Sequence, residues 1–462
     1  MSNQIHIIQN AITTTISEIF RGDFRRICEV KKAVLHLEAI YFCHGTCYLL
    51  KRENMPIKDQ LALYQRIELI PQSTTEFFEN NRECIINNWP EESALAAKPE
   101  ILYDALLASE FCVQPERVGY KIDKVSRDIA GAYYTSSDFS AQITYRALES
   151  YMDRKRRRAI DSDSFACCNE YENITFLDYS CGCGEFLLAV IQYFDNHVLG
   201  YSRKKLATQL RGVDVNPIAL MITIARIVSA VEAEDDENLL REVAKNFIVG
   251  NPLLHRDKIA PLEVRFDNFA LNRLYAETEG INCLELEQQN LVVLGNPPWE
   301  KLRFEERAFF RPVCPAISAI SQKNKREKEI KKLAVNWLEL LEYYQLLQDD
   351  YASVKKEIPK HPLLKVSLVG ELNTYAMFAE LASRLTEKDG FAAIIAKSAL
   401  VTSTCYSSCF RHFVNQGSLS EVFLFDNREK LFQIDSREKF CVLFFGGEHA
   451  GGIKVHYGLT KQ

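Results

Sequence analysis

The sequence lacks a long apolar run and a hydrophobic leader. No stretch approaches the roughly 18 uninterrupted apolar residues that a membrane-spanning helix requires. The first residues include Glu18 and Asp23 and no continuous apolar core, so a secretory signal is not expected. Internal repeats and low-complexity segments are also missing. We therefore expect no membrane association and a cytoplasmic location.

Cysteine is scarce as well. The chain has 14 cysteines among 462 residues, far fewer than a disulfide scaffold uses, and an intracellular chain keeps its thiols reduced. A structural zinc site combines two closely spaced ligand pairs. The cysteine pairs of this chain are interpreted instead as buried small hydrophobic residues, so no metal site is predicted. These pairs are Cys43/Cys47, Cys167/Cys168, Cys181/Cys183 and Cys405/Cys409.

Positive charge is not in excess. The net charge of −6 argues against a large nonspecific nucleic-acid surface, although two basic runs stand out locally. Arg154 to Arg158 are five cations in a row, and residues 323–332 hold six cations among ten residues. Taken alone, each run is typical of a solvated helix face or loop. The chain is 47% apolar and 26% charged, which is the composition of a globular protein with a sizeable core.

The chain divides into two regions with different patterns of apolar residues. Residues 1–125 carry apolar residues at three- and four-residue spacings with few turn signals, and they predict a helical N-terminal domain. From about residue 130, short apolar strands alternate with helical segments. This alternation predicts an α/β fold with a doubly wound, Rossmann-like sheet in a second domain over residues 126–462.

The predicted sheet has a parallel part and a different C-terminal edge. The parallel strands are expected at 174–178, 210–214, 246–249, 291–294 and 391–396. The last apolar segments, 421–425, 440–445 and 453–457, have no helix between them and predict an antiparallel edge. A charged helical stretch at about 301–365 is interpreted as an insertion.

Candidate ligand-binding residues follow the first three strands, where open α/β sheets bind ligands. Asp178 ends the first strand, and Gly182 and Gly184 after it let the backbone turn tightly and approach a ligand. Asp214 ends the second strand, where an acid can accept both ribose hydroxyls of an adenosine. Asn251 follows the third strand, where it can frame an adenine ring. The alternatives are a simple turn for the glycines and a helix N-cap for Asp214.

The sharpest motif is Asn296-Pro297-Pro298-Trp299, directly after the fourth strand. Two prolines beside an asparagine also suit a rigid turn. A turn alone does not explain an exposed Trp299 at a strand end, or why the motif follows a glycine loop and an acid-tipped strand. We therefore predict that these strand ends form one pocket.

The combination resembles the N6-adenine DNA methyltransferases, in the class whose cofactor motifs precede an Asn-Pro-Pro-aromatic motif. Protein-glutamine methyltransferases share the tetrad. However, Gly131-Ala132-Tyr133-Tyr134-Thr135 resembles the tyrosine-rich segment that precedes the first strand in the DNA enzymes. Residues 373–378 and 391–398 resemble later motifs of the same class. The resemblance covers roughly residues 125–457.

The resemblance implies S-adenosylmethionine as the cofactor and gives roles to the matching residues. Asp214 would bind the ribose, and Asn251 would lie near the adenine. Side chains at positions 179, 180 and 183 depart from the usual motif but spare both glycines, so altered affinity is expected rather than lost binding. The residues that would hold or line the methionine end are Tyr133, Tyr134, Thr135, Asp178, Gly182 and Gly184.

The chemistry of adenine explains the catalytic tetrad. The exocyclic nitrogen of adenine is a poor nucleophile because its lone pair is delocalised into the ring. The Asn296 side-chain oxygen and the Pro297 carbonyl can accept its two N–H groups, so that the lone pair faces the methyl donor for direct transfer. The base must leave the duplex for this step. Pro298 completes the turn, and Trp299 would stack on the base, a contact worth about 1–3 kcal/mol.

The sequence thus favours methyl transfer to adenine N6 in DNA, within a restriction–modification or phage-defence system. The alternatives are a methyltransferase acting on protein glutamine or RNA, and a non-catalytic nucleic-acid-binding subunit. The chain stops at Gln462, shortly after the last predicted strand, so we expect a separate target-recognition subunit or a nuclease as a partner besides DNA. A truncated gene product is the simpler alternative.

Overall fold

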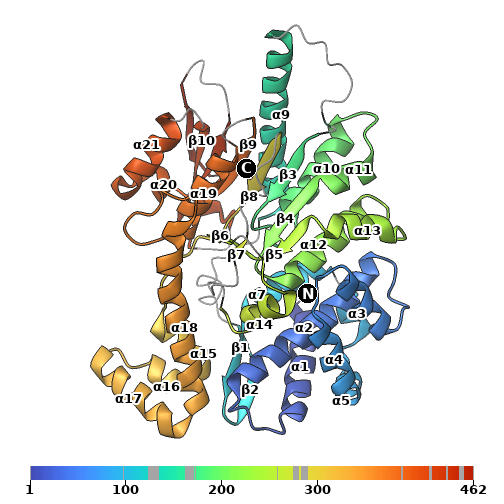
Figure 1. The fold of residues 1–462 in the computed structure, drawn as a ribbon, viewed down its shortest axis with the longest axis vertical. Coiled ribbons are helices and arrows are strands. Elements are labelled where there is room, and N and C mark those ends of the chain that lie inside the picture. Colours follow the sequence, from blue (N-terminus) through green and yellow to red (C-terminus); the bar gives the residue numbers. More distant parts are fainter. Residues whose placement is uncertain are drawn as a thin grey trace.

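The fold was analysed in a computed structural model. The described residues are 2–96, 98–122, 135–161, 171, 173–256, 259–273, 280–281, 290–386, 389–415, 419–432, 435–446 and 452–460. Figure 1 places the large sheet in one half of the molecule and the N-terminal helices and the insertion in the other half. Tyr133 and Tyr134, predicted to bind the cofactor, lie outside the described residues. No helix within the described ranges is long and apolar enough to cross a membrane.

The N-terminal region is mostly helical. Its helices are α1 (Ser2–Ile19), α2 (Ile27–Leu49), α3 (Ile57–Arg66), α4 (Gln72–Asn80), α5 (Arg82–Asn87), α6 (Glu92–Leu95) and α7 (Pro99–Leu107). The purely helical prediction is wrong after residue 108, because β1 (Ser109–Gln114) and β2 (Arg117–Ile122) form an antiparallel hairpin. Phe111, Val113, Val118 and Tyr120 alternate with other residues there, which is the period of a strand.

The central sheet contains eight strands in the order β12-β10-β11-β9-β8-β3-β4-β5. Its parallel part matches the prediction closely, with β4 and β8 beginning at the predicted residues. The strands are β3 (Thr175–Asp178), β4 (Leu210–Asp214), β5 (Phe247–Val249), β8 (Leu291–Gly295), β9 (Phe391–Lys397), β10 (Leu419–Asp426), β11 (Lys439–Phe445) and β12 (Lys454–Leu459).

The C-terminal edge differs in part from the antiparallel prediction. β11 pairs antiparallel with both β9 and β10, as expected. β12 pairs parallel with β10. The chain passes from β11 beyond β10 before it pairs, so β12 runs in the direction of β10 instead of returning against it.

Helices cover both faces of this sheet. Phe444 of β11 contacts Phe391 of β9, which faces Tyr151 of α9 (Ser137–Asp161). The next residue, Phe445, contacts Phe413 of α21 (Ser407–Asn415). Successive strand residues point to opposite faces, so α9 and α21 lie on opposite sides of the sheet. The remaining helices and short strands after β3 are α10 (Glu185–His197), α11 (Arg203–Gln209), α12 (Pro217–Ala230), α13 (Glu237–Ala244), β6 (Asn251–His255), α14 (Leu262–Ala270), β7 (Gly280–Ile281), α19 (Thr374–Leu385) and α20 (Ala399–Thr402).

The first basic run is not simply a solvated helix face. Arg154 of α9 is buried and donates to the carbonyl oxygens of Asp389 (2.6 Å) and Gly390 (2.8 Å) and to that of Gly446. One guanidinium therefore ties α9 to the start of β9 and the end of β11. The prediction that the paired cysteines are buried is wrong for Cys405, which is exposed in the turn before α21. Cys167 and Cys168 lie outside the described residues.

The insertion forms a helical arm. It contains α15 (Glu306–Val313), α16 (Pro315–Ser318), α17 (Lys323–Asn336) and α18 (Leu338–Glu357). Trp337 Nε1 donates to the Arg25 carbonyl at 2.7 Å, and the Tyr343 hydroxyl donates to the Leu271 carbonyl at 2.9 Å. The arm therefore packs against the N-terminal region and α14 beside the sheet (Figure 1).

Candidate active site

Two glycines shape the loop after β3. Gly182 has φ +50° and Gly184 has φ +85°, both in the left-handed region that side chains disfavour. A Cβ on Gly184 would lie 2.7 Å from the Thr223 Cγ2 atom, whereas one on Gly182 would meet no atom within 4 Å. Gly184 is therefore needed for close packing at the start of α10, whereas the half-buried Gly182 has space beside its backbone that no described atom fills. Only the second arrangement suits an approaching ligand.

Two side chains of helix α12 bind the backbone of this loop. The Thr223 hydroxyl donates to the Gly182 carbonyl at 2.7 Å. Arg226 donates to the Cys183 carbonyl and binds Glu185 at 2.7 Å. The sequence interpretation missed both residues. The available signal was their position, since Thr223 and Arg226 are three residues apart in a mostly apolar helix.

Asp214, at the end of β4, binds backbone N–H groups on two sides. Its carboxylate accepts from Gly182 N and from Asn216 N, both at 2.9 Å. The N-cap of α12 is Asn216, whose side-chain oxygen accepts from Ile218 N, so the alternative that Asp214 caps this helix is wrong. A carboxylate has about four lone-pair sites, so two bonds leave acceptor capacity. The ribose role of Asp214 stays a prediction.

Asp178 is a buried acid beside the same loop. Its side chain accepts from Ser180 N at 3.0 Å and is 2% exposed. Burial, with the Asp214 carboxylate as a lesser cause, raises the pKa of Asp178 to about 8. Burial also raises the pKa of Asp214. Neither acid has an ion pair within the described part of the chain, so the pocket favours a ligand that brings positive charge or hydrogen-bond donors.

The fourth strand brings Asn296 to the same edge of the sheet. β8 pairs parallel with β3, with Val293 opposite Leu177. A Cβ on Gly295 would lie 2.8 Å from Asp178 Oδ1, so any other residue before Asn296 would displace the buried Asp178 carboxylate. Gly295 was missed, although glycine inside an apolar strand is a signal of close backbone approach. Asn296 Nδ2 donates to Thr135 Oγ1 at 3.1 Å, which joins two predicted site residues.

The start of α19 fixes the turn that follows Asn296. The Thr374 hydroxyl donates to the Pro298 carbonyl at 2.5 Å and accepts from Glu300 N at 3.0 Å. Leu302 N donates to the Leu372 carbonyl at 2.9 Å, which extends the pairing. Residues 373–378 were predicted to resemble a later motif of the same class. Among them, Thr374 contacts the Asn296–Trp299 turn.

Trp299 is not exposed, contrary to expectation. Its side chain is 5% exposed and packs at ring-centroid distances of 5.4 Å from Phe432 and 6.1 Å from Phe440. The local pattern around Trp299 carries no sign of these partners, because β11 brings Phe440 to the turn from elsewhere in the chain. The stacking of Trp299 on a target base stays a prediction.

Asn251 lies after β5 and is anchored by the insertion. It is buried, and its side-chain oxygen accepts from Leu253 N at 3.0 Å. His361 Nδ1 accepts from Leu363 N, so Nε2 carries the proton that is donated to the Pro252 carbonyl at 3.1 Å. Burial lowers the pKa of His361 to about 4, which keeps this ring neutral. The end of the insertion thus fixes the segment predicted to frame the adenine.

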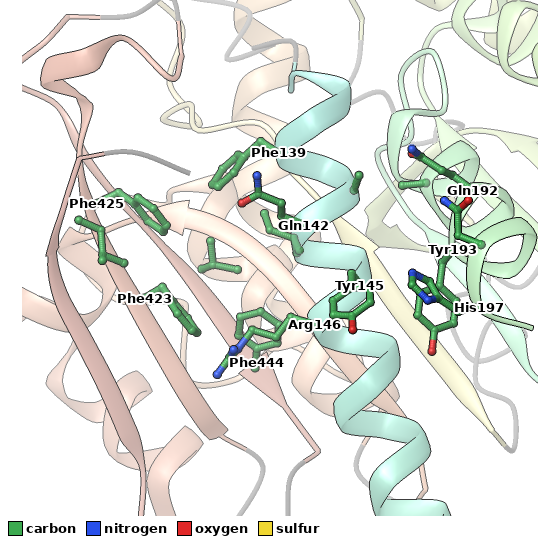
Figure 2. A pocket seen from close by; sticks show the side chains of 16 residues that line it. Phe139, Gln142, Tyr145, Arg146, Gln192, Tyr193, His197, Phe423, Phe425 and Phe444 are labelled. Carbon is green, nitrogen blue, oxygen red and sulfur yellow. The ribbon is translucent and has the colours of Figure 1, made fainter.

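A separate cavity lies away from these strand ends. It has a volume of about 570 Å³ between α9, α10 and the β10–β11 edge (Figure 2). Phe139 and Gln142 line it from α9, Phe425 and Phe444 from the strands, and Tyr193 from α10. Among the described residues, no predicted site residue belongs to its lining. The candidate site is therefore the carboxyl edge of β3, β4 and β8.

Comparison with known proteins gives a likeness of fold. No family model matches the chain, and no curated protein matches it. The ATP-dependent Type ISP restriction–modification enzyme LlaBIII, solved bound to DNA, superposes with a TM-score of 0.51 at 10% identity, over 99% of this chain and 30% of that one. A nuclease-deletion mutant of the Type ISP enzyme LlaGI with a DNA substrate mimic gives 0.49 at 13% identity, over 99% and 34%. The DrdV–DNA complex gives 0.48 at 13% identity, over 98% and 43%.

The LlaBIII superposition shows that the chain shares the fold of part of that restriction–modification enzyme. The chain spans less than half the length of each of these three structures. At such low identity, the likeness carries the fold and assigns no residue of the site.

Proposed function

We propose that this protein transfers a methyl group from S-adenosylmethionine to the N6 amine of adenine in DNA, within a restriction–modification or phage-defence system. One observation carries the proposal: the glycine loop, Asp178 and Asp214 share a single sheet edge with the Asn296 turn. Residues that would bind a nucleotide cofactor thus lie beside an amide that would accept a base amine. The fold shared with LlaBIII, a restriction–modification enzyme solved on DNA, supports the substrate class.

The residues on the cofactor side suit S-adenosylmethionine. This cofactor supplies an electrophilic methyl group when bound, and it carries positive charge on its sulfonium and ammonium groups. Asp178, uncharged at neutral pH because its pKa is about 8, would ionise beside such a cation. Asp214 would use its remaining acceptor capacity for the ribose hydroxyls. Gly182 offers backbone beside open space, and Asn251 would frame the adenine.

The residues on the base side suit an amine. The bond from Asn296 Nδ2 to Thr135 Oγ1 sets the orientation of the amide, so the side-chain oxygen points the other way. That oxygen and the Pro297 carbonyl would accept the two N–H groups of adenine and leave the nitrogen lone pair directed at the methyl group. Thr374 would keep Pro297 and Pro298 in place through the Pro298 carbonyl. The protein therefore accelerates transfer by positioning and by fixed dipoles.

The target adenine must be turned out of the duplex, because an active site cannot reach the N6 amine while the base is stacked in DNA. Trp299 belongs to the proposal as a stacking surface, and a base would have to displace part of its contact with Phe432 or Phe440. A separate target-recognition subunit or a nuclease belongs to the proposal as a partner.

Transfer of a tritiated methyl group tests this proposal. The purified protein would be incubated with labelled S-adenosylmethionine and with DNA, RNA or protein in parallel. We expect label in DNA, recovered as N6-methyladenine after digestion to nucleosides. Label in RNA or in protein glutamine alone would contradict the DNA assignment, and no cofactor binding would contradict the methyltransferase assignment. Long-read sequencing of DNA from an expressing host would then give the modified positions.

A further inference from the structure

The outer face of α17 is strongly basic. Lysines 323, 325, 328, 331 and 332 of this helix are all exposed. Lys323 pairs with Glu327 at 3.8 Å, and Lys332 pairs with Glu329 at 2.7 Å. Lys325, Lys328 and Lys331 have no acidic partner within the described part of the chain. They are spaced by three residues, so they form one stripe about 9 Å long on the helix surface.

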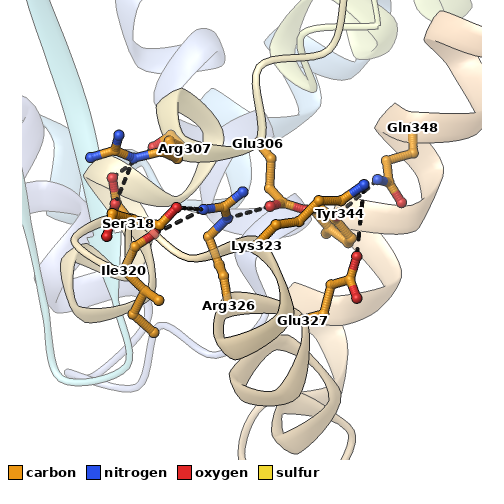
Figure 3. A network of polar contacts seen from close by, with 10 residues as sticks. Glu306, Arg307, Ser318, Ile320, Lys323, Arg326, Glu327, Tyr344 and Gln348 are labelled. Carbon is orange, nitrogen blue, oxygen red and sulfur yellow. Dashed lines mark hydrogen bonds and ion pairs between the residues drawn. The ribbon is translucent and has the colours of Figure 1, made fainter.

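The opposite face of α17 is anchored, which directs the lysines outward. Arg326 is buried and binds Glu306 of α15, and it donates to the Ile320 carbonyl at 2.8 Å (Figure 3). Glu306 also accepts from the Tyr344 hydroxyl of α18 at 2.6 Å. Ile330 and Leu333 complete the buried face. A helix held by a guanidinium, a carboxylate and apolar contacts presents its lysine stripe in a fixed position.

The arm that carries α17 is rooted in the candidate site. It begins directly after Trp299, where Leu302 pairs with Leu372. It ends near His361, which binds Pro252 beside Asn251. Figure 1 shows α17 at the far end of the arm from the sheet, so its lysines lie away from the strand ends where a target base would bind.

We propose that Lys325, Lys328 and Lys331 bind phosphates of duplex DNA that flanks the target base. The inference rests on the proposed function for the identity of the nucleic acid. With a net charge of −6, the protein has little general attraction for a polyanion, so a local unpaired stripe has a disproportionate effect. The other basic run uses Arg154 inside the fold. Lysine contacts to phosphate position a protein on DNA without reading sequence.

The test is the salt dependence of duplex binding by a triple variant, Lys325→Gln, Lys328→Gln and Lys331→Gln. Each phosphate contact contributes about 0.9 to the slope of log affinity against log salt. We expect the slope to fall by about 2.7 and the affinity to weaken at low salt, with S-adenosylmethionine affinity and melting temperature unchanged. The matched control is Lys98→Gln, Lys121→Gln and Lys245→Gln, which removes the same charge from exposed lysines that also have no acidic partner within the described part of the chain.

The outcomes separate this inference from the proposed function. An unchanged slope in the α17 triple variant, or equal losses in both triple variants, would overturn the inference while leaving methyl transfer to DNA intact. Loss of RNA binding with unchanged DNA binding would also overturn it, because the stripe would then serve another nucleic acid. Salt-dependent DNA binding through α17 by a protein that transfers no methyl group would support the inference and contradict the proposed function.

Discussion

The two sides of the candidate site are held by different parts of the chain. On the cofactor side, Asp214 and the glycine loop are fixed by backbone N–H groups and by Thr223 of α12. On the base side, Asn296 and its turn are fixed by Thr135 and by Thr374 of α19. The sides meet where Gly295 lies against Asp178 and where the Tyr179 hydroxyl donates to the Phe378 carbonyl of α19 at 2.9 Å. Because different elements hold the two sides, mutations should be able to affect cofactor binding and methyl transfer separately.

Asn296→Ala gives the largest expected effect and distinguishes the base side from the cofactor side most clearly. It removes an acceptor for the base amine, so methyl transfer should fall about 10²–10³-fold, as for loss of one preorganised group in other enzymes. Cofactor affinity, measured by calorimetry, should not change. Asn296→Asp keeps an acceptor oxygen and should retain part of the rate. A variant that loses cofactor affinity as much as rate would show that the two sides are not independent.

Asp214→Ala should act on the opposite side. Each charge-assisted hydrogen bond to the ribose is worth about 1.5–3 kcal/mol, so cofactor affinity should weaken about 10- to 150-fold per lost bond. The Asp214 carboxylate also binds Gly182 N and Asn216 N, so thermal unfolding must establish that the variant is folded. Asp214→Asn keeps one acceptor oxygen and should weaken affinity less. Unchanged affinity in a folded Asp214→Ala protein would refute the ribose assignment.

The Asp178 pKa predicts a pH dependence on the cofactor side. A cation that binds beside Asp178 requires its ionised form, so below pH 8 a proton must leave on binding. Affinity should rise with pH, by up to about tenfold per unit, and level off above about pH 8. In the cofactor-free protein, the pKa of Asp178 is about 8 in the folded state, against 3.8 for a free aspartate. The folded state therefore gains stability from this group that is fully present below pH 3.8 and is lost as the pH rises through 8. Calorimetry across pH with an Asp178→Asn control measures this, and identical profiles would exclude Asp178 as the source.

Thr374→Val gives the smallest expected effect and tests the support of the base side. The hydroxyl bonds to Pro298 and Glu300 are each worth about 1 kcal/mol, so kcat should fall roughly fivefold or more. The KM for the cofactor should stay the same, because Thr374 acts as a positioning residue for the turn. Thr402→Val, which removes an exposed hydroxyl bonded to the Ser398 carbonyl, is the matched control. A parallel rise in cofactor KM would indicate general destabilisation.

Much of the fold was predictable from local sequence. The strand Leu210–Asp214 was predicted to the residue, because a short apolar run between polar segments is a local signal. The β1–β2 hairpin and the parallel pairing of β12 were not predicted. Strand direction depends on which strand the chain meets in space, and that information is not in the local pattern.

The candidate site was also predictable only in part. The strand-end positions of Asp178, Asp214 and Asn296 followed from the βα alternation. Trp299 and Arg154 were misjudged, because an aromatic or a guanidinium is exposed or buried according to distant partners such as Phe440 and Gly390. Supporting residues such as Thr374 carry no local signature of the carbonyl that they bind.

In the proposed mechanism, one sheet edge holds both the cofactor and the reacting base. The most direct measurement is a crystal structure with an unreactive S-adenosylmethionine analogue. We predict its ribose hydroxyls on Asp214, its methionine end along Gly182 beside Asp178, and its sulfur-equivalent atom directed at Asn296. An analogue bound elsewhere, for example in the cavity between α9 and the β10–β11 edge, would contradict the account.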